Sequence, residues 1–289
     1  MKRIIALTLV SLFALGAAAR ETAQVLPPDG TTVAMLCADL NRHLADRGGR
    51  IHTNVVSEDG PQFAFLIPVA GNVQGAGNTF FHSDISIINT RLVSQRITIA
   101  FLRQNTNSGS DPVTVMTLPA NSVTDIDDFV ASKLGRTGIG ALVVSGTNPD
   151  GSIDTSASLD GFSRIWTPQP GSSGTVSQSL SSVPLDDVIA DSWALGLKQD
   201  ARFRTNVGAV NTSGNPRTFT ITVKGSGGTT TATMTAAPYS MSQQSLPAGN
   251  WGNLSLTIGT ALTDLDWWTA YGTTVDNVTG DGWVSHAHH

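Results

Sequence analysis

Cysteine and charge are both scarce in this chain of 289 residues. Cys37 is the single cysteine, so no disulfide can form within the chain, and a scaffold held together by disulfides is excluded. Charged residues make up 13% of the sequence, well below the roughly 25% of an average soluble domain. With a net charge of −5, the chain lacks the clustered Lys and Arg on which binding to nucleic acid depends. We therefore expect stability from buried cores, and no nucleic-acid partner.

A hydrophobic run long enough to cross a bilayer is also missing. The longest candidate, Ile4–Leu15, falls short of the ~20 apolar residues that a membrane-spanning helix needs. It follows the basic pair Lys2-Arg3 and precedes four small residues at 16–19, an arrangement typical of a secretory signal peptide. We predict a signal peptide at 1–19, a mature chain with no transmembrane segment, and a secreted or periplasmic location.

Length and composition indicate two all-β domains preceded by a short helix. The chain is long enough for two domains of about 100 to 150 residues, and it is rich in Thr, Ser, Asn and Gly. Apolar residues at helical spacing predict a helix over 31–47, within a linker segment at 20–61. Cys37 falls on the apolar side of that helix, which favours a buried thiol over one that pairs with another chain.

From residue 62 onward the hydrophobic period changes to two, which is the period of strands with one buried face. We expect a first β-sandwich domain at 62–184 and a second at 185–289. A short helix is predicted at 124–135, where acidic residues occupy the first turn and a glycine ends the pattern. The predicted strands are 63–69, 84–89, 96–103, 113–118, 141–145, 158–166 and 176–183 in the first domain, and 203–212, 219–223, 231–237, 240–246, 254–258, 267–275 and 283–286 in the second.

An internal repeat relates the two predicted domains. Residues 81–90, FHSDISIINT, align with residues 203–212, FRTNVGAVNT. The register then continues without a gap (97 against 219, as 81 against 203), and it aligns Ile97, Ile99 and Phe101 with Phe219, Ile221 and Val223. Such a match predicts an internal duplication. In both copies Asn-Thr ends the first strand and alternation resumes after it, so we expect each block to form a two-stranded hairpin.

Several short motifs accompany this repeat. A strand ending in Ile67-Pro-Val69 is followed by a glycine-rich loop at 71–77, then by the two Phe strands with their Asn-Thr turns, and the last strand reads AYGTTVDNVTGD over 270–281. In these motifs most of 62–287 resembles the tandem immunoglobulin-like or fibronectin-like β-sandwich repeats of secreted bacterial proteins of unassigned function. The resemblance implies two tandem immunoglobulin-like sandwiches and carries no activity with it.

No arrangement of catalytic residues stands out. A G-x-S-x-G elbow is absent, and no spacing joins His43, His52 or His82 to a serine and an aspartate. The acidic turns at 150–154 and 276–281 offer spaced oxygens, but they lack the pattern of a calcium-binding EF-hand loop with its distant glutamate. We predict no catalytic residue, no cofactor and no metal site.

Aromatic residues are the remaining candidates for contact with a ligand or partner. The second domain contains Trp267, Trp268, Tyr271 and Trp283. Trp267 and Trp268 are consecutive in a predicted strand, so their side chains point to opposite faces, and we expect one in the core and the other exposed. An exposed ring of this kind can stack on a sugar or anchor a protein partner.

These observations favour an exported, non-catalytic structural or protein-interaction module, acting on an unknown protein or glycan of the cell envelope or extracellular space. One alternative is a carbohydrate-binding module that uses the second-domain aromatics, for which a row of coplanar exposed rings is expected. A second alternative is a secreted hydrolase whose residues meet only in three dimensions, for which a deep pocket with His, Asp and Ser is expected.

Overall fold

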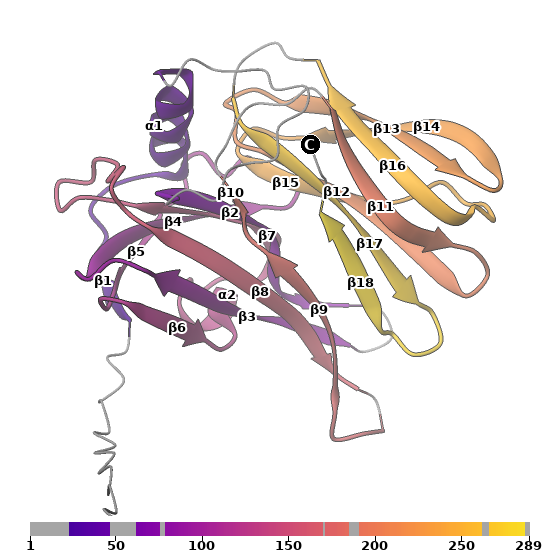
Figure 1. Cartoon of the computed structure of the whole chain (residues 1–289), viewed down its shortest axis with the longest axis horizontal. Coiled ribbons are helices and arrows are strands. Elements are labelled where there is room, and N and C mark those ends of the chain that lie inside the picture. The colour runs from indigo at the N-terminus through magenta and orange to yellow at the C-terminus, as the bar shows by residue number, and fades with distance from the viewer. Residues whose placement is uncertain are drawn as a thin grey trace, which may run out of the picture.

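A computed structural model describes residues 23–46, 62–75, 79–169, 171–184, 191–261 and 266–286. The chain is mostly β-strand, arranged in antiparallel sheets, with two helices in the described ranges, so the predicted all-β class is confirmed. The strands form two lobes that lie against each other (Figure 1). The predicted signal peptide lies outside the described residues, and so do residues 185–190, which follow the predicted boundary between the two domains.

The predicted N-terminal helix is confirmed as α1, Val33–Asp46. The Thr32 hydroxyl accepts a hydrogen bond from the Met35 backbone N–H (3.4 Å), so it satisfies one of the free N–H groups at the helix start. Cys37 is buried, as predicted, and it is a free cysteine in the structure. Burial raises the pKa of its thiol to about 12, with a further contribution from the Asp266 carboxylate. The buried side of the helix consists of Val33, Leu36, Cys37, Leu40 and Leu44.

The first sandwich has two layers of antiparallel strands. The upper layer in Figure 1 has the order β1-β5-β4-β7-β2, and the lower layer has the order β6-β3-β8-β9. Two residue pairs at the ends of β2 and β3 link the layers, and β10 pairs with β2. The upper strands are β1 Gln24–Leu26, β2 Ala64–Gln74, β4 Gln95–Arg103, β5 Thr114–Leu118, β7 Gly138–Gly146 and β10 Val183–Pro184. The lower strands are β3 Phe80–Asn89, β6 Ser122–Ile126, β8 Leu159–Pro168 and β9 Thr175–Ser181.

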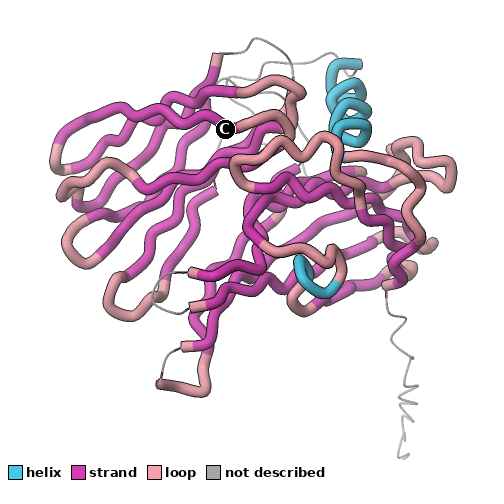
Figure 2. The backbone as a smooth tube through the Cα atoms, turned by 180° about the vertical axis from the view of Figure 1, so that it is seen from behind, coloured by secondary structure: helices cyan, strands magenta, loops and turns pink. Residues whose placement is uncertain are grey.

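The second sandwich repeats this strand order. Its layers run β14-β13-β16-β11 and β15-β12-β17-β18, so the strands β11 to β18 occupy the places that β2 to β9 occupy in the first sandwich. Figure 2 shows the same two lobes from behind. The strands are β11 Asp191–Gln199, β12 Phe203–Asn211, β13 Arg217–Gly225, β14 Gly228–Ala236, β15 Ser240–Ser245, β16 Gly252–Thr260, β17 Trp268–Asp276 and β18 Gly282–His286.

The alternating residues found in the sequence form the cores between the layers. Phe219, Ile221 and Val223 on β13 are fully buried in a cluster that belongs to the second sandwich alone. Burying side chains of this size contributes roughly 1.5–3 kcal/mol each. A larger cluster fills the first sandwich, includes the apolar side of α1, and extends to four residues of the second sandwich, namely Val210, Met241, Trp267 and Tyr271.

The hairpin predicted for each repeated block is wrong, because its two strands lie in different layers. β3 pairs with β6 and β8, whereas β4 pairs with β5 and β7. The connection instead crosses from one layer to the other around Asn89. The buried Asn89 side chain donates hydrogen bonds to the carbonyls of Val93 (2.9 Å) and Pro119 (2.8 Å), and it accepts one from the Arg91 N–H (3.1 Å). An alternating pattern identifies the buried face of a strand but not the layer to which that strand belongs.

The helix predicted at 124–135 is shorter than expected. Asp125 of the acidic stretch lies in strand β6, whose Ile126 pairs with Ile85 of β3, and Asp127 and Asp128 lie in a turn. Only Phe129–Ser132 is helical, as α2. Asp128 separates the two elements with a left-handed backbone (φ 45°). Strand β11 was not predicted, because a bulge between Ala194 and Leu197 breaks its alternation.

Candidate functional site

The four aromatic residues predicted as contact sites lie in very different surroundings. Trp268 is buried in the second core, where its ring lies 5.2 Å from that of Phe219. Trp267 and Tyr271 are also buried, at 3% and 0% exposure, and belong to the cluster that joins the two sandwiches. Only Trp283 of the four is partly open to solvent, at 39%. The expected exposed ring of the Trp267-Trp268 pair is therefore absent, because the first sandwich covers the outer side of β17.

Hydrogen bonds join the covered face of the second sandwich to α1 and to the first sandwich. The Asn41 side chain of α1 accepts a hydrogen bond from the Trp267 N–H (3.1 Å) and donates one to the Thr212 carbonyl (3.4 Å). In the loop after β4, the Asn105 N–H donates to the carbonyl of Met241 on β15 (2.8 Å). The edge of β15 thus pairs with the first sandwich through the backbone as well as through apolar side chains.

Three residues form the apolar centre of this contact, and we name them the docking face: Val210, Met241 and Tyr271. All three are fully buried. Val210 pairs with Met241 across β12 and β15, and Tyr271 of β17 lies opposite Gly208 of β12. A Cβ atom on Gly208 would lie 2.2 Å from the Tyr271 ring, so the absence of a side chain lets this ring lie flat on the strand. Burial raises the pKa of the Tyr271 phenol, whose O–H donates to Gln243 Oε1 (2.7 Å).

The first sandwich has apolar residues at the matching positions of its lower layer, but these residues are exposed or partly exposed to solvent. Ile88 pairs with Val123 across β3 and β6, and Phe162 of β8 lies opposite Ser86 of β3. These pairings match those of Val210, Met241 and Tyr271 strand for strand. Val123 is 59% exposed and Phe162 is 41% exposed. We name the three residues Ile88, Val123 and Phe162 the open face.

Beside the open face lies a cluster of rings on β3 and β8. The His82 ring stacks on Trp166 at 4.7 Å and lies 5.0 Å from the half-exposed ring of Phe80. His82 Nδ1 is 3.1 Å from the Asp128 carboxylate, which fixes the edge of the ring. The imidazole is thus held between two rings and a carboxylate.

Arg164 of β8 connects this ring cluster with the open face. Its guanidinium lies 5.7 Å from the Trp166 ring centre, 3.4 Å from the Asp84 carboxylate, and donates to the Thr175 hydroxyl (2.5 Å). An arginine held over a tryptophan is a common energetic anchor of protein interfaces. Arg164 and Asp84 thus lie opposite each other on the central strands β8 and β3, and Asp160 lies opposite Ile88, so charged groups border the apolar residues of the open face directly.

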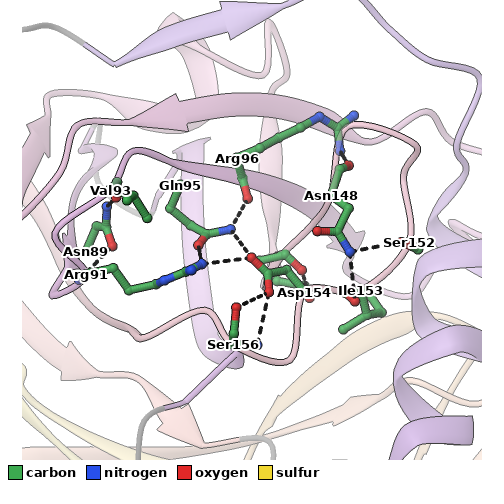
Figure 3. A network of polar contacts seen from close by, with 12 residues as sticks. Asn89, Arg91, Val93, Gln95, Arg96, Asn148, Ser152, Ile153, Asp154 and Ser156 are labelled. Atoms are coloured by element: carbon green, nitrogen blue, oxygen red, sulfur yellow. Dashed lines mark hydrogen bonds and ion pairs between the residues drawn. The ribbon is translucent and has the colours of Figure 1, made fainter.

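The first acidic turn uses its carboxylates within the protein (Figure 3). Asp154 Oδ2 accepts hydrogen bonds from Arg91 (2.9 Å) and Gln95 (3.2 Å), and Oδ1 accepts from the N–H (3.0 Å) and hydroxyl (2.6 Å) of Ser156. Burial acts to raise the pKa of Asp154, but the bonds from Ser156 and Gln95 and the Arg91 charge together hold it below its ordinary value. This network links the turn to Arg91 and Gln95, in the connection that follows Asn89 between β3 and β4.

The second acidic turn is closed by an ion pair between Arg202 and Asp276. Both Nε and Nη2 of Arg202 donate to Asp276 Oδ2 (2.9 and 2.7 Å), and Oδ1 accepts from the Val278 N–H (2.8 Å). The hydrogen bonds from Arg202, then that from Val278, and the Arg202 charge hold the pKa of Asp276 at about 2, below its ordinary 3.8. The carboxylate is thus charged and bound throughout the neutral range.

This ion pair makes stability sensitive to acid. Because the pKa of Asp276 is lower in the folded state, the stabilisation is present above pH 3.8 and is lost as the pH falls toward about 2. We expect Asp276→Asn to lower the thermal midpoint at neutral pH and to leave a smaller further fall between pH 4 and pH 2 than the natural chain shows. Thermal unfolding of both chains across that pH range measures the difference, and parallel curves would contradict this assignment.

Two hollows lie on the surface of the described residues. One of about 280 Å³ lies beside α1, and one of about 470 Å³ lies between β11 and β16. Within the described residues, no three His, Cys, Asp or Glu side chains are placed to hold a metal ion. Neither helix of the described ranges is long and apolar enough to cross a bilayer. The first hollow is lined by Ala38, Asn41, Arg42, Ala45, Tyr239 and Asp266, and the second by Gly196, Leu197, Lys224, Asn253, Leu254 and Ser255.

Comparison of the chain with models of known protein families finds no match, and comparison with curated proteins finds none either.

Proposed function

We propose that this protein is an exported, non-catalytic interaction module that binds protein through the open face of its first sandwich. The observation that carries this proposal is the match between the open face and the docking face. At the same register positions, the chain buries Val210, Met241 and Tyr271 against another sandwich, exposes Val123 and Phe162, and leaves Ile88 partly buried. A surface of that chemistry is already used for protein contact once within this chain.

The composition of the open face favours protein over sugar as its ligand. Two of its three residues, Ile88 and Val123, are aliphatic and offer no planar ring on which a sugar can stack. The apolar residues border the charged pair of Arg164 and Asp84, and protein interfaces commonly combine apolar residues with arginine. The aromatics named for a carbohydrate site support that alternative less well, because three of those four rings are buried.

An internal duplication is part of the proposal, since it explains why the two faces match. Both sandwiches have the same strand order, and Asn211 repeats the bonds of Asn89. It donates to the carbonyls of Asn215 (2.8 Å) and Ala237 (2.9 Å) and accepts from the Ser213 N–H (3.0 Å). The two tandem immunoglobulin-like sandwiches, the cleaved signal peptide and the location in the cell envelope or extracellular space belong to the same proposal.

Depletion from solution tests the proposed function. Residues 20–289 are mixed with cell-envelope fractions, with the same fractions after protease digestion, and with insoluble polysaccharides. We expect only the undigested envelope fractions to remove the protein, because the ligand is protein. We expect Phe162→Asp to abolish this removal, because a carboxylate in the centre of the apolar face would be buried without a partner.

The matched control is Leu195→Asp, which places the same charge on an apolar residue that is 55% exposed in the second sandwich. This variant is expected to be removed like the natural chain. Circular dichroism establishes that both variants are folded. Removal by a polysaccharide, removal that survives protease digestion, or equal behaviour of Phe162→Asp and the natural chain would each contradict the proposal.

A further inference from the structure

We infer that the partner of the open face is the open face of a second copy of this chain, related by a two-fold axis. This inference rests on the proposed function and names its partner. The two copies bury Ile88, Val123 and Phe162 against each other, as the chain already buries the matching docking face. A two-fold contact uses the same patch twice and closes as a dimer.

The second sandwich of another copy fits the open face less well. Within the chain, the docking face lies against the upper layer of the first sandwich, where Ala100 and Leu102 of β4 are fully buried on the outer side. At the matching positions of β13 the second sandwich has Thr222 and Lys224, with Lys224 exposed. Because the second sandwich presents polar groups there, a head-to-tail chain of copies would lose the apolar contact.

The margins of the open face complement each other across a two-fold axis. The β6 margin carries the exposed Asp125, whereas β9 at the opposite margin has no charged residue and exposes Ser179 and Ser181. Since the layer has the order β6-β3-β8-β9, an axis parallel to the strands places the acidic margin of one copy over the serine margin of the other. Serine hydroxyls then donate to the Asp125 carboxylate. An axis perpendicular to the strands would instead bring Asp125 against its own copy.

The area of the layer suits a weak dimer. Its four strands, of 5, 10, 10 and 7 residues, lie about 4.8 Å apart and rise about 3.3 Å per residue, which gives a flat footprint on the order of 500 Å². Stable complexes bury upward of about 600 Å² on each partner, so the layer falls somewhat below this limit. We therefore expect a dimer that dissociates on dilution.

Sedimentation velocity over a dilution series of residues 20–289 tests this inference. We expect the natural chain to shift from dimer toward monomer as it is diluted. Phe162→Asp and Val123→Asp are both expected to remain monomeric at every concentration, and Leu195→Asp is expected to follow the natural chain. Because Val123 is 59% exposed, its variant tests the same face with little risk to the fold.

Ser181→Asp tests the orientation of the two copies, because the strand pairings put Ser181 level with Asp125. It places an acid over Asp125 of the other copy, so we expect a weaker dimer, and the double variant Ser181→Asp/Asp125→Ser is expected to restore it. A natural chain that is monomeric throughout, or Phe162→Asp that dimerises as well as Leu195→Asp does, would overturn the inference. A monomer that envelope protein still removes from solution in a Phe162-dependent way would overturn it while the proposed function stands.

Discussion

Tyr271→Ala lowers the free energy of unfolding by about 4 kcal/mol, whereas Phe162→Ala lowers it by less than about 1 kcal/mol. The two rings occupy matching positions of the two sandwiches, but Tyr271 is fully buried between them and Phe162 is 41% exposed. Removing the buried ring opens a cavity in the cluster that holds the lobes together. Equilibrium unfolding in urea, followed by circular dichroism at a concentration where the chain is monomeric, measures both differences.

A third variant separates the ring of Tyr271 from its hydroxyl. Tyr271→Phe keeps the ring and leaves Gln243 Oε1 without the hydrogen bond of 2.7 Å, which we expect to cost about 1–2 kcal/mol. Equal losses for Tyr271→Ala and Phe162→Ala would mean that the docking face does not contribute to stability as its burial implies, and the argument from matching faces would fail with it.

Asn89→Ala and Asn211→Ala are each expected to lower the free energy of unfolding by about 3 kcal/mol. Both side chains are fully buried, and each makes two hydrogen bonds to carbonyls and one from an N–H. Leaving such buried groups unpaired costs ~1–3 kcal/mol apiece, partly relieved by water. The same urea titration measures the two losses.

Asn215→Ala is the matched control for these two variants. Its side chain is exposed, and only its backbone carbonyl takes part in the bonds of Asn211, so we expect a change within about 0.5 kcal/mol. A large loss at Asn211 with none at Asn89 would show that the two connections differ in energy although they have the same geometry.

The sequence identified the strands and their buried faces because one face of each layer meets a core. Ile97, Ile99 and Phe101 alternate with residues of the other face, and so do Phe219, Ile221 and Val223, and all six residues are buried. The same alternation carries no information on which layer a strand joins. Hence β3 and β4 were paired as a hairpin, although Asn89 carries the chain from one layer to the other.

The burial of Trp267 and Tyr271 depends on the first sandwich and α1, and not on their own strand. A period of two assigns neighbouring residues to opposite faces, and the outward face of a sandwich is ordinarily wet. Here the first sandwich and α1 cover that face, through contacts such as that of Asn41 with Trp267. No local pattern in β17 signals contact with residues more than 200 positions away in the sequence.

The open face was missed for a related reason, although the repeat contained a signal for it. Aligning the two copies places Ile88 on Val210, and both are aliphatic at outward positions of their strands. Two aliphatic residues at one outward position of a duplicated strand indicate a shared contact. Val123 and Phe162 required the strand pairing itself, because their matches Met241 and Tyr271 lie at different offsets in the sequence.

Nitroxide labels, one on the outer surface of each sandwich, test most directly whether the open face is the surface through which two copies bind each other. Ser181→Cys places a label beside Phe162, and Thr233→Cys places one on the outer layer of the second sandwich. The buried Cys37, with its pKa raised to about 12, does not compete for the reagent in the folded chain. When excess unlabelled chain is added, we expect the spectrum at 181 to show an immobilised label and that at 233 to stay unchanged. An unchanged spectrum at 181 would contradict the claim.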